Sequence, residues 1–290
     1  MIHIATILKH NVIVKLLNHL VVFFINVLIV RLLGASGSGA YFNELYALNF
    51  VVFIFSAGLD YAAIAWLSRD LKYLPVINKI LLQVICLFII FLVSTVILFP
   101  GMAKAYFQQP VSAILFFSTG NLLLIFFQGV LSALKKFNLQ NIILGACNLL
   151  FLAYLYFFFK PSEPDNLEKI AIAYAALLLI QGIMMFAFSY AKSLDNNIKV
   201  NRAAFLRSGI YIMFSSLVYF AFLRVDNFFV EKYAGNITLG NYVQCGKIGQ
   251  YFLYFSSIIS STILPFISTE TVGASYTEWK KMMKPYIILI

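Results

Sequence analysis

The chain contains eight long runs of mostly apolar residues, and this feature limits what it can fold into. A helix needs about 20 consecutive apolar residues to cross a membrane. Backbone polar groups in lipid must be satisfied within the segment, so the runs predict helices rather than isolated strands. The runs are Val12–Leu33, Tyr41–Leu67, Ile80–Phe99, Val111–Leu134, Leu139–Phe159, Ile170–Tyr190, Ser208–Val230 and Tyr242–Ile267, and a ninth opens at Met282. The expected fold class is an all-α integral membrane protein, a polytopic helical bundle.

The charges of the chain are few and unevenly placed. Only 11% of residues are charged, and the formal net charge is +10. If the N-terminus is cytoplasmic, 14 Lys and Arg residues fall on the inner side, 5 on the outer side and 2 within spans. Cytoplasmic loops of membrane proteins carry this excess, so we expect a multi-pass inner-membrane protein with a cytoplasmic N-terminus. The same bias explains the net charge without a nucleic-acid partner.

The sequence contains few residues or motifs that indicate a metal site, a cofactor site or an enzyme. Cys86, Cys147 and Cys245 lie inside apolar runs, as small buried hydrophobic residues do, and the three histidines form no ligand cluster. No HExxH, GxSxG or P-loop motif occurs. The acidic residues of 160–169 have only a ten-residue turn to support them. We therefore expect no cofactor, no metal and no enzyme.

Two stretches of the chain repeat one glycine pattern 201 residues apart. Gly34, Gly39 and Tyr41 correspond to Gly235, Gly240 and Tyr242, and each stretch joins two apolar runs. The copies follow spans one and seven, so both halves cross the membrane in the same direction. Parallel repeats of this kind form the two lobes of many transporters. We predict a first lobe of six helices over residues 1–190, a basic cytoplasmic linker over 191–207, and the start of an incomplete second lobe over 208–290.

In the hairpin formed by the first two predicted spans, charged residues of the two helices lie at similar depths in the membrane. Counted from the turn at Gly37, Arg31 and Glu44 lie at nearly equal depth, and so do Lys15 and Asp60. Each residue adds about 1.5 Å along a helix, so these pairs predict polar layers between the two helices. Structural charge pairing and a role in a water-filled cavity both remain open for these four residues.

The second hairpin carries Arg224, Asp226 and Lys247 inside its spans. Asp226 and Lys247 lie at similar depth, whereas Arg224 is two residues from Asp226 and points to another face of the helix. Charges persist in a membrane where they face a partner or a water-filled cavity. We expect Arg224 and Lys247 to bind an anionic substrate, with Asp226 available for ion coupling or charge pairing.

The order and spacing of several short motifs resemble polysaccharide flippases. Arg31-Leu32-Leu33-Gly34, Gly39-x-Tyr41 and Gly58-Leu59-Asp60 are similar to the opening of these proteins. Arg224-x-Asp226, Gly240-x-Tyr242 and Pro265-x-Ile267-Ser268 are similar to their seventh and eighth spans. These flippases are the O-antigen and exopolysaccharide members of the multidrug/oligosaccharidyl-lipid/polysaccharide exporter superfamily.

The resemblance implies two lobes, twelve to fourteen helices and alternating access. It implies flipping of a polyprenyl-pyrophosphate-linked oligosaccharide from the cytoplasmic to the outer leaflet, coupled to H⁺ or Na⁺. From the placement of the charges, we expect Arg224, Lys247 and Arg31 as substrate-binding residues, and Asp226, Asp60, Glu44 and Lys15 as ion-coupling or charge-pairing residues. Other polysaccharide assembly proteins and membrane lipids are the expected partners. The alternatives are a multidrug exporter of the same superfamily and a membrane-embedded glycan polymerase.

Overall fold

The computed structural model describes residues 2–99, 110–161, 165–190 and 201–267. These residues form helices connected by short turns, and no strand occurs among them. Six of the described helices are long and apolar enough to cross a membrane by length and composition. The expected all-α, multi-pass architecture is therefore confirmed at this level. The predicted ninth span, from Met282, lies outside the described residues.

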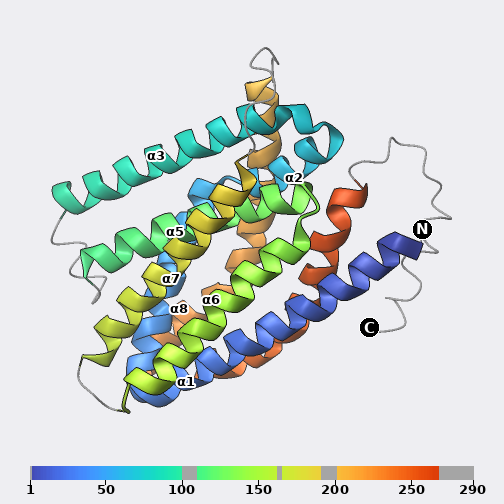
Figure 1. Ribbon diagram of the computed structural model, residues 1–290. Coiled ribbons are helices and arrows are strands. Elements are labelled where there is room, and N and C mark those ends of the chain that lie inside the picture. The colour runs from blue at the N-terminus through green and yellow to red at the C-terminus, as the bar shows by residue number, and fades with distance from the viewer. Residues whose placement is uncertain (1, 100–109, 162–164, 191–200, 268–290) are drawn as a thin grey trace.

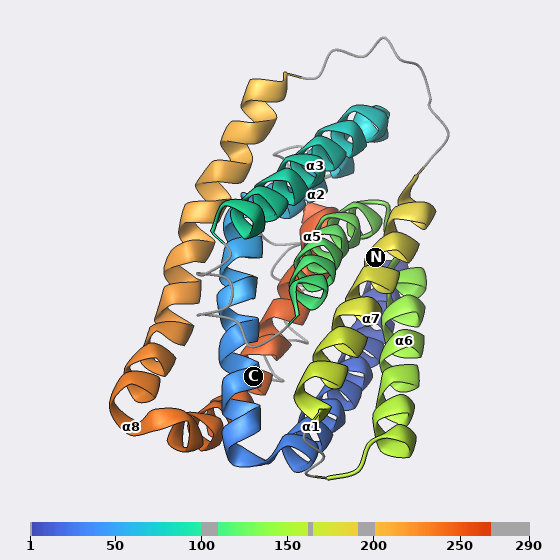
Figure 2. The ribbon, with the colours of Figure 1, turned by 90° about the vertical axis from the view of Figure 1, so that its left-hand side faces the viewer.

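Two of the helices are hairpins rather than single rods. Helix α1 (Ile2–Ser56) and helix α8 (Arg202–Ile267) each contain one glycine at which the chain reverses. The turns at Gly34 and Gly235 lie at the same end of the molecule (Figure 2). Each hairpin therefore has a first arm before its glycine and a second arm after it. The arms of α1 correspond to the first predicted span and to most of the second, and the arms of α8 contain the seventh and eighth.

The glycines Gly34 and Gly235 have nearly the same backbone conformation. Gly34 has φ 70° and ψ −179°, and Gly235 has φ 75° and ψ 173°. This region of φ and ψ is accessible almost only to glycine, because a Cβ atom would clash with the backbone. Beyond the adjoining backbone, a Cβ added at either position would meet no atom within 4 Å, so the backbone conformation and not tertiary packing demands glycine there. The sequence repeat thus corresponds to a repeat of local structure.

The remaining helices form the body against which the hairpins pack. They are α2 (Leu59–Arg69), a 3₁₀ turn (Leu71–Tyr73), α3 (Leu74–Leu98), α5 (Val111–Ala133), α6 (Phe137–Phe158) and α7 (Asn166–Ser189). Their bounds lie within a few residues of the predicted spans, apart from the earlier starts of α3 and α7. In Figure 1, α5, α7, α6 and the first arm of α1 follow one another in a layer, with α3 at the far side. Helix α5 is central, and its Phe126, Phe127, Val130 and Leu131 are fully buried.

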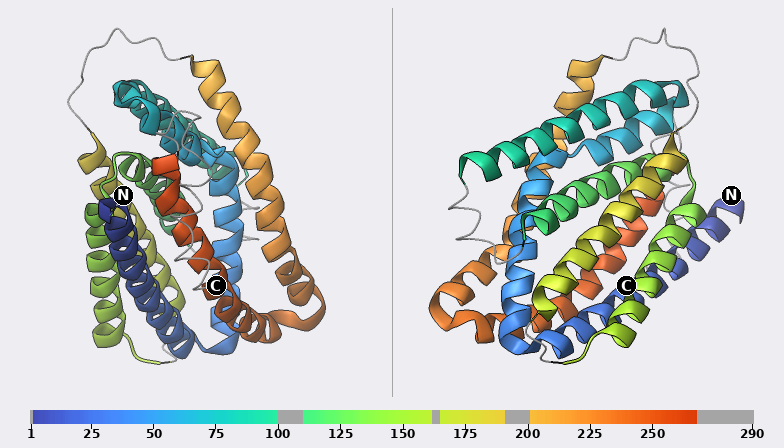
Figure 3. Two further views of the ribbon diagram at one scale, coloured as in Figure 1. Left: turned by 90° about the vertical axis from the view of Figure 1, so that its right-hand side faces the viewer. Right: turned by 60° about the vertical axis from the view of Figure 1, so that its left-hand side comes forward.

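The first arm of α8 runs along the second arm of α1 and reaches α2 (Figure 3). Aromatic rings make this contact. The ring of Phe220 lies 5.5 Å from that of Phe50 and 5.9 Å from that of Phe53, and Phe205 meets Trp66 edge to face at 5.8 Å. Aromatic pairs at these distances stabilise a contact beyond their buried area.

The two hairpins also meet at their turns, through equivalent glycines. A Cβ added at Gly240 would lie 2.2 Å from the carbonyl oxygen of Ala35 and 3.4 Å from the amide nitrogen of Gly39. Gly39 and Gly240 occupy the same place in the two repeats. In two copies related by a twofold axis, a position contacts its own equivalent only near that axis. The glycine contact therefore brings equivalent positions of the two hairpins together.

Candidate functional site

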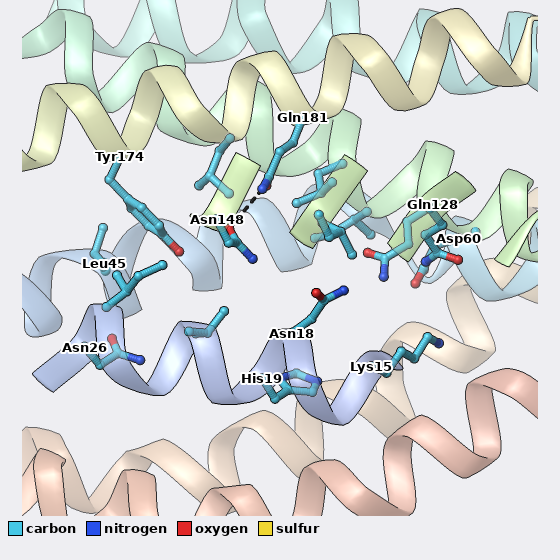
Figure 4. A pocket seen from close by; sticks show the side chains of 18 of the residues that line it. Lys15, Asn18, His19, Asn26, Leu45, Asp60, Gln128, Asn148, Tyr174 and Gln181 are labelled. Atoms are coloured by element: carbon cyan, nitrogen blue, oxygen red, sulfur yellow. Dashed lines mark hydrogen bonds between the residues drawn. The ribbon is translucent and has the colours of Figure 1, made fainter. Parts of the chain in front are cut away.

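A polar cavity lies inside the helical body, between the two arms of α1 and helices α2, α5, α6 and α7. Its volume is about 450 Å³, within the range of small-molecule sites. Figure 4 shows side chains from α1 and from the facing helices pointing into the same space. The polar lining residues are Lys15, Asn18, His19, Asn26, Tyr41, Asp60, Tyr61, Gln128, Ser132, Gln140, Asn148, Tyr174 and Gln181. Polar side chains are expensive inside a membrane, so this concentration marks the candidate site.

Six carboxamide side chains give the cavity its character, and hydrogen bonds hold several of them in place. Gln181 of α7 donates from Nε2 to Oδ1 of Asn148 on α6, at 3.0 Å (Figure 4). Asn18 of α1 donates to the main-chain oxygen of Asn141 on α6, at 3.1 Å. These bonds join different helices, so the positions of the amides in the wall depend on the packing of the bundle.

Two buried polar groups of the wall have no protein partner. Gln140 is fully buried and accepts a hydrogen bond from Ser132 Oγ at 3.2 Å, yet its Nε2 group has no partner. The hydroxyl of Tyr41 is likewise buried and unpartnered. Leaving a buried donor unsatisfied costs about 1–3 kcal/mol. Both atoms are closed off by their neighbours, so a molecule in the cavity would reach them only after a local rearrangement.

The charged residues of the wall gather at one end. Lys15 is 8% exposed and lines the same end of the cavity as Asp60 and Gln128 (Figure 4). The depth match between Lys15 and Asp60 in the sequence thus corresponds to a shared cavity. His19 lies one helical turn from Lys15 on the same wall.

A break in the second predicted span places Asp60 at this cavity. The second arm of α1 ends at Ser56, and Ala57 (φ 47°) and Gly58 (φ 64°) have left-handed conformations before α2 begins at Leu59. A Cβ at Gly58 would lie 2.5 Å from the main-chain oxygen of Gly209 on α8. The single helix expected over Tyr41–Leu67 is therefore two helices. Interrupted helices are a recurring feature of transporter sites, because freed backbone groups line the cavity.

Arg31 and Glu44 face different surroundings. Arg31 is exposed and lines a groove between α1 and α6 that includes Phe24, Leu149 and Tyr156. Glu44 is 6% exposed and lies against α5 and α7, beside Phe117. Equal depth along the hairpin therefore does not bring these two side chains to one face of the bundle.

Two asparagines, one in each arm of α1, have different surroundings. Asn26 lines the cavity, whereas Asn49 accepts a hydrogen bond from Nδ2 of Asn121 on α5, at 2.6 Å.

In the second hairpin, Asp226 bonds with a residue of the repeated pattern. Tyr242 donates its hydroxyl hydrogen bond to Oδ2 of Asp226 across the turn. The side chains of Arg224 and Lys247 lie outside the part of the chain that the structure describes, so their predicted substrate contacts stay predictions. Between the hairpins, Asn43 donates from Nδ2 to Oε1 of Glu231 at 2.8 Å.

Sequence reasoning missed most of the cavity. It singled out Lys15 and Asp60 by charge and passed over the amides Asn18, Gln128, Asn148 and Gln181, which line the same space. A signal existed, because each of these amides interrupts an apolar run and a polar group in a span needs a reason to be there. The sequence does not indicate, however, which amides converge.

These features define the chain as a polytopic helical membrane protein with two structurally repeated hairpins and a polar cavity in its helical body. No protein-family model, curated protein or solved structure matches it.

Proposed function

We propose that this chain is a membrane transporter that works by alternating access between two repeated lobes. One observation carries the proposal: Gly34 and Gly235 adopt the same glycine-only conformation, and the hairpins they create meet at Gly39 and Gly240. Parallel repeats about an axis along the membrane normal are a common plan of secondary transporters. The arrangement gives two similar units, and in the proposed movement their contact at the turns opens and closes.

The transported molecule in this proposal is a polyprenyl-pyrophosphate-linked oligosaccharide, moved from the cytoplasmic to the outer leaflet. The resemblance of the motifs to polysaccharide flippases supports this substrate, and so does the polar cavity within the membrane region. Arg224, Lys247 and Arg31 would bind the pyrophosphate, because cationic side chains favour phosphate oxygens. Asp226, Glu44 and the Lys15–Asp60 end of the cavity would respond to H⁺ or Na⁺. An inner-membrane location with a cytoplasmic N-terminus follows from the placement of lysine and arginine.

The two alternatives fit the described residues less well. A multidrug exporter would favour aromatic and acidic residues over cations, whereas this wall carries Lys15 and six carboxamides beside its one carboxylate, Asp60. A glycan polymerase needs supported catalytic carboxylates. At the outer turn, Asp165 is exposed and paired with Lys169 at 3.5 Å, which is the environment of an ordinary surface ion pair.

The test is to locate lipid-linked oligosaccharide in cells that lack the gene. Spheroplasts are treated with a glycan-degrading enzyme that does not cross the membrane. A flippase predicts that the oligosaccharide accumulates on the inner leaflet and is protected from the enzyme. Accumulation on the outer leaflet, where the enzyme degrades it, would place the protein after the flipping step and refute the proposal.

A further inference from the structure

We infer that the cavity between α1, α2, α5, α6 and α7 is a binding site for one short, uncharged saccharide unit. The inference deepens the proposed function and rests on it for its biological setting, because it assigns the glycan part of the substrate to this cavity. The binding itself is a property of the wall and can be tested separately.

The hydrogen-bonding groups of the wall match those of a sugar. A carboxamide presents two N–H donors and a carbonyl acceptor, and a sugar hydroxyl both donates and accepts. Adjacent hydroxyls on a sugar ring therefore fit adjacent amides such as Asn148 and Gln181, which already contact each other. Asn18 points toward Asn148 from the opposite wall (Figure 4). A polyhydroxylated ligand between them can satisfy both walls.

The charge of the wall selects an uncharged ligand. Lys15 and Asp60 line the same end and carry opposite formal charges, and the rest of the polar wall is amide, hydroxyl and imidazole. The wall has no surplus of cations to pair with an anionic sugar, and burying an unpaired charge is strongly unfavourable. The pyrophosphate of a lipid-linked substrate would consequently lie elsewhere.

The shape of the cavity sets the size of the ligand. Lys15 and Asn26 are eleven residues apart on one helix, which corresponds to about 16 Å along the cavity. Tyr174 adds an aromatic face near the Asn26 end (Figure 4). Aromatic rings with a polar edge pack well against ligands that have apolar and polar faces. With a volume of about 450 Å³, the cavity accommodates a unit of one or two rings.

A proton pathway is the main competing explanation, and the residues disfavour it. Proton relays in membranes are built from Asp, Glu and His side chains. Six residues of this wall are amides, which keep their protons at neutral pH. Asp60 and His19 occupy only the Lys15 end, so they do not continue along the cavity.

The test measures saccharide binding to the full chain in lipid nanodiscs by saturation-transfer difference NMR. Glucose, galactose and N-acetylglucosamine are tested singly, with glucuronate as the charged comparison. We expect at least one uncharged sugar to bind with millimolar affinity and glucuronate to bind markedly more weakly. Asn148→Leu should weaken binding about tenfold, because it removes one hydrogen-bonding group of the wall and keeps the number of side-chain heavy atoms.

Two further variants separate binding from folding. Gln128→Met also removes an amide of the wall, and none of the described hydrogen bonds depends on it, so it should lower affinity with little effect on stability. Asn121→Leu is the matched control: it removes the hydrogen bond between Asn121 and Asn49, outside the cavity, and should leave binding unchanged.

The inference is overturned if no uncharged sugar binds the folded wild-type chain. It is also overturned if glucuronate binds as well as glucose, or if Asn121→Leu weakens binding as much as Asn148→Leu. Its failure is distinguishable from failure of the proposed function. If no sugar binds but the oligosaccharide accumulates on the inner leaflet of cells lacking the gene, the saccharide site is wrong and the flippase proposal stands. If a sugar binds but the oligosaccharide accumulates on the outer leaflet, the saccharide site stands and the flippase proposal is wrong.

Discussion

Replacing Gly240 by alanine should separate the two hairpins at their turns. The added Cβ would lie 2.2 Å from the carbonyl oxygen of Ala35, where ordinary van der Waals contact begins at about 3.4 Å. The opposing atom belongs to the backbone, so no side-chain rotation relieves the clash. The turns must therefore move apart by roughly 1 Å. Overpacking of this size costs about 1–3 kcal/mol.

The assay is thermal unfolding of the purified chain in detergent, followed by the loss of the monodisperse fraction. One kcal/mol corresponds to about 2–4 °C in Tm for chains somewhat smaller than this one, so Gly240→Ala should melt several degrees lower. Gly246→Ala is the matched control, because it lies in the same helix and its Cβ would meet nothing within 4 Å. Equal melting temperatures for the two variants would refute the close contact between the repeats.

Three other variants test separate features of the structure. Gly235→Ala should lower Tm by a few degrees although there is space for its Cβ, because φ 75° and ψ 173° strain any other residue by about 1–3 kcal/mol; an unchanged Tm would show that the turn differs. Tyr242→Phe should destabilise the second hairpin by about 1–3 kcal/mol, because it removes the hydrogen bond to Asp226. In a double-mutant cycle, Tyr242→Phe combined with Asp226→Asn should cost less than the sum of the two single changes. Asn121→Leu should cost about 1–3 kcal/mol, since it leaves Asn49 without its hydrogen bond, and a neutral effect on Tm would argue against that contact.

The hairpins could be predicted from the sequence because a local requirement specifies them. Gly34 and Gly235 recur at a fixed spacing between apolar runs, and the structure shows why glycine is required at both. The spans follow from the length of each run, which is also a local property. The break at Ala57–Gly58 was less visible, since apolar residues continue across it and the tight approach of Gly209 comes from a distant helix.

The candidate site was only partly predictable, because depth along a helix does not determine direction around it. Arg31 and Glu44 lie at similar depth, yet one faces a groove beside α6 and the other packs against α5 and α7. Successive residues turn by about 100° around the axis, so an error of one or two positions moves a side chain to another face. The amides Asn148 and Gln181 converge only once α6 and α7 pack together.

The central claim, that two repeats meet at their turns and move against each other, has one most direct test. The native cysteines are replaced, Asn43 and Glu231 are changed to cysteine, and a short, reducible thiol cross-linker is added to intact cells that lack the wild-type gene. The two side chains are hydrogen-bonded at 2.8 Å, so we expect rapid cross-linking between the hairpins. Surface polysaccharide should then stop appearing and should resume after reduction. Failure to cross-link would contradict the contact, and normal polysaccharide production by fully cross-linked protein would contradict the proposed movement.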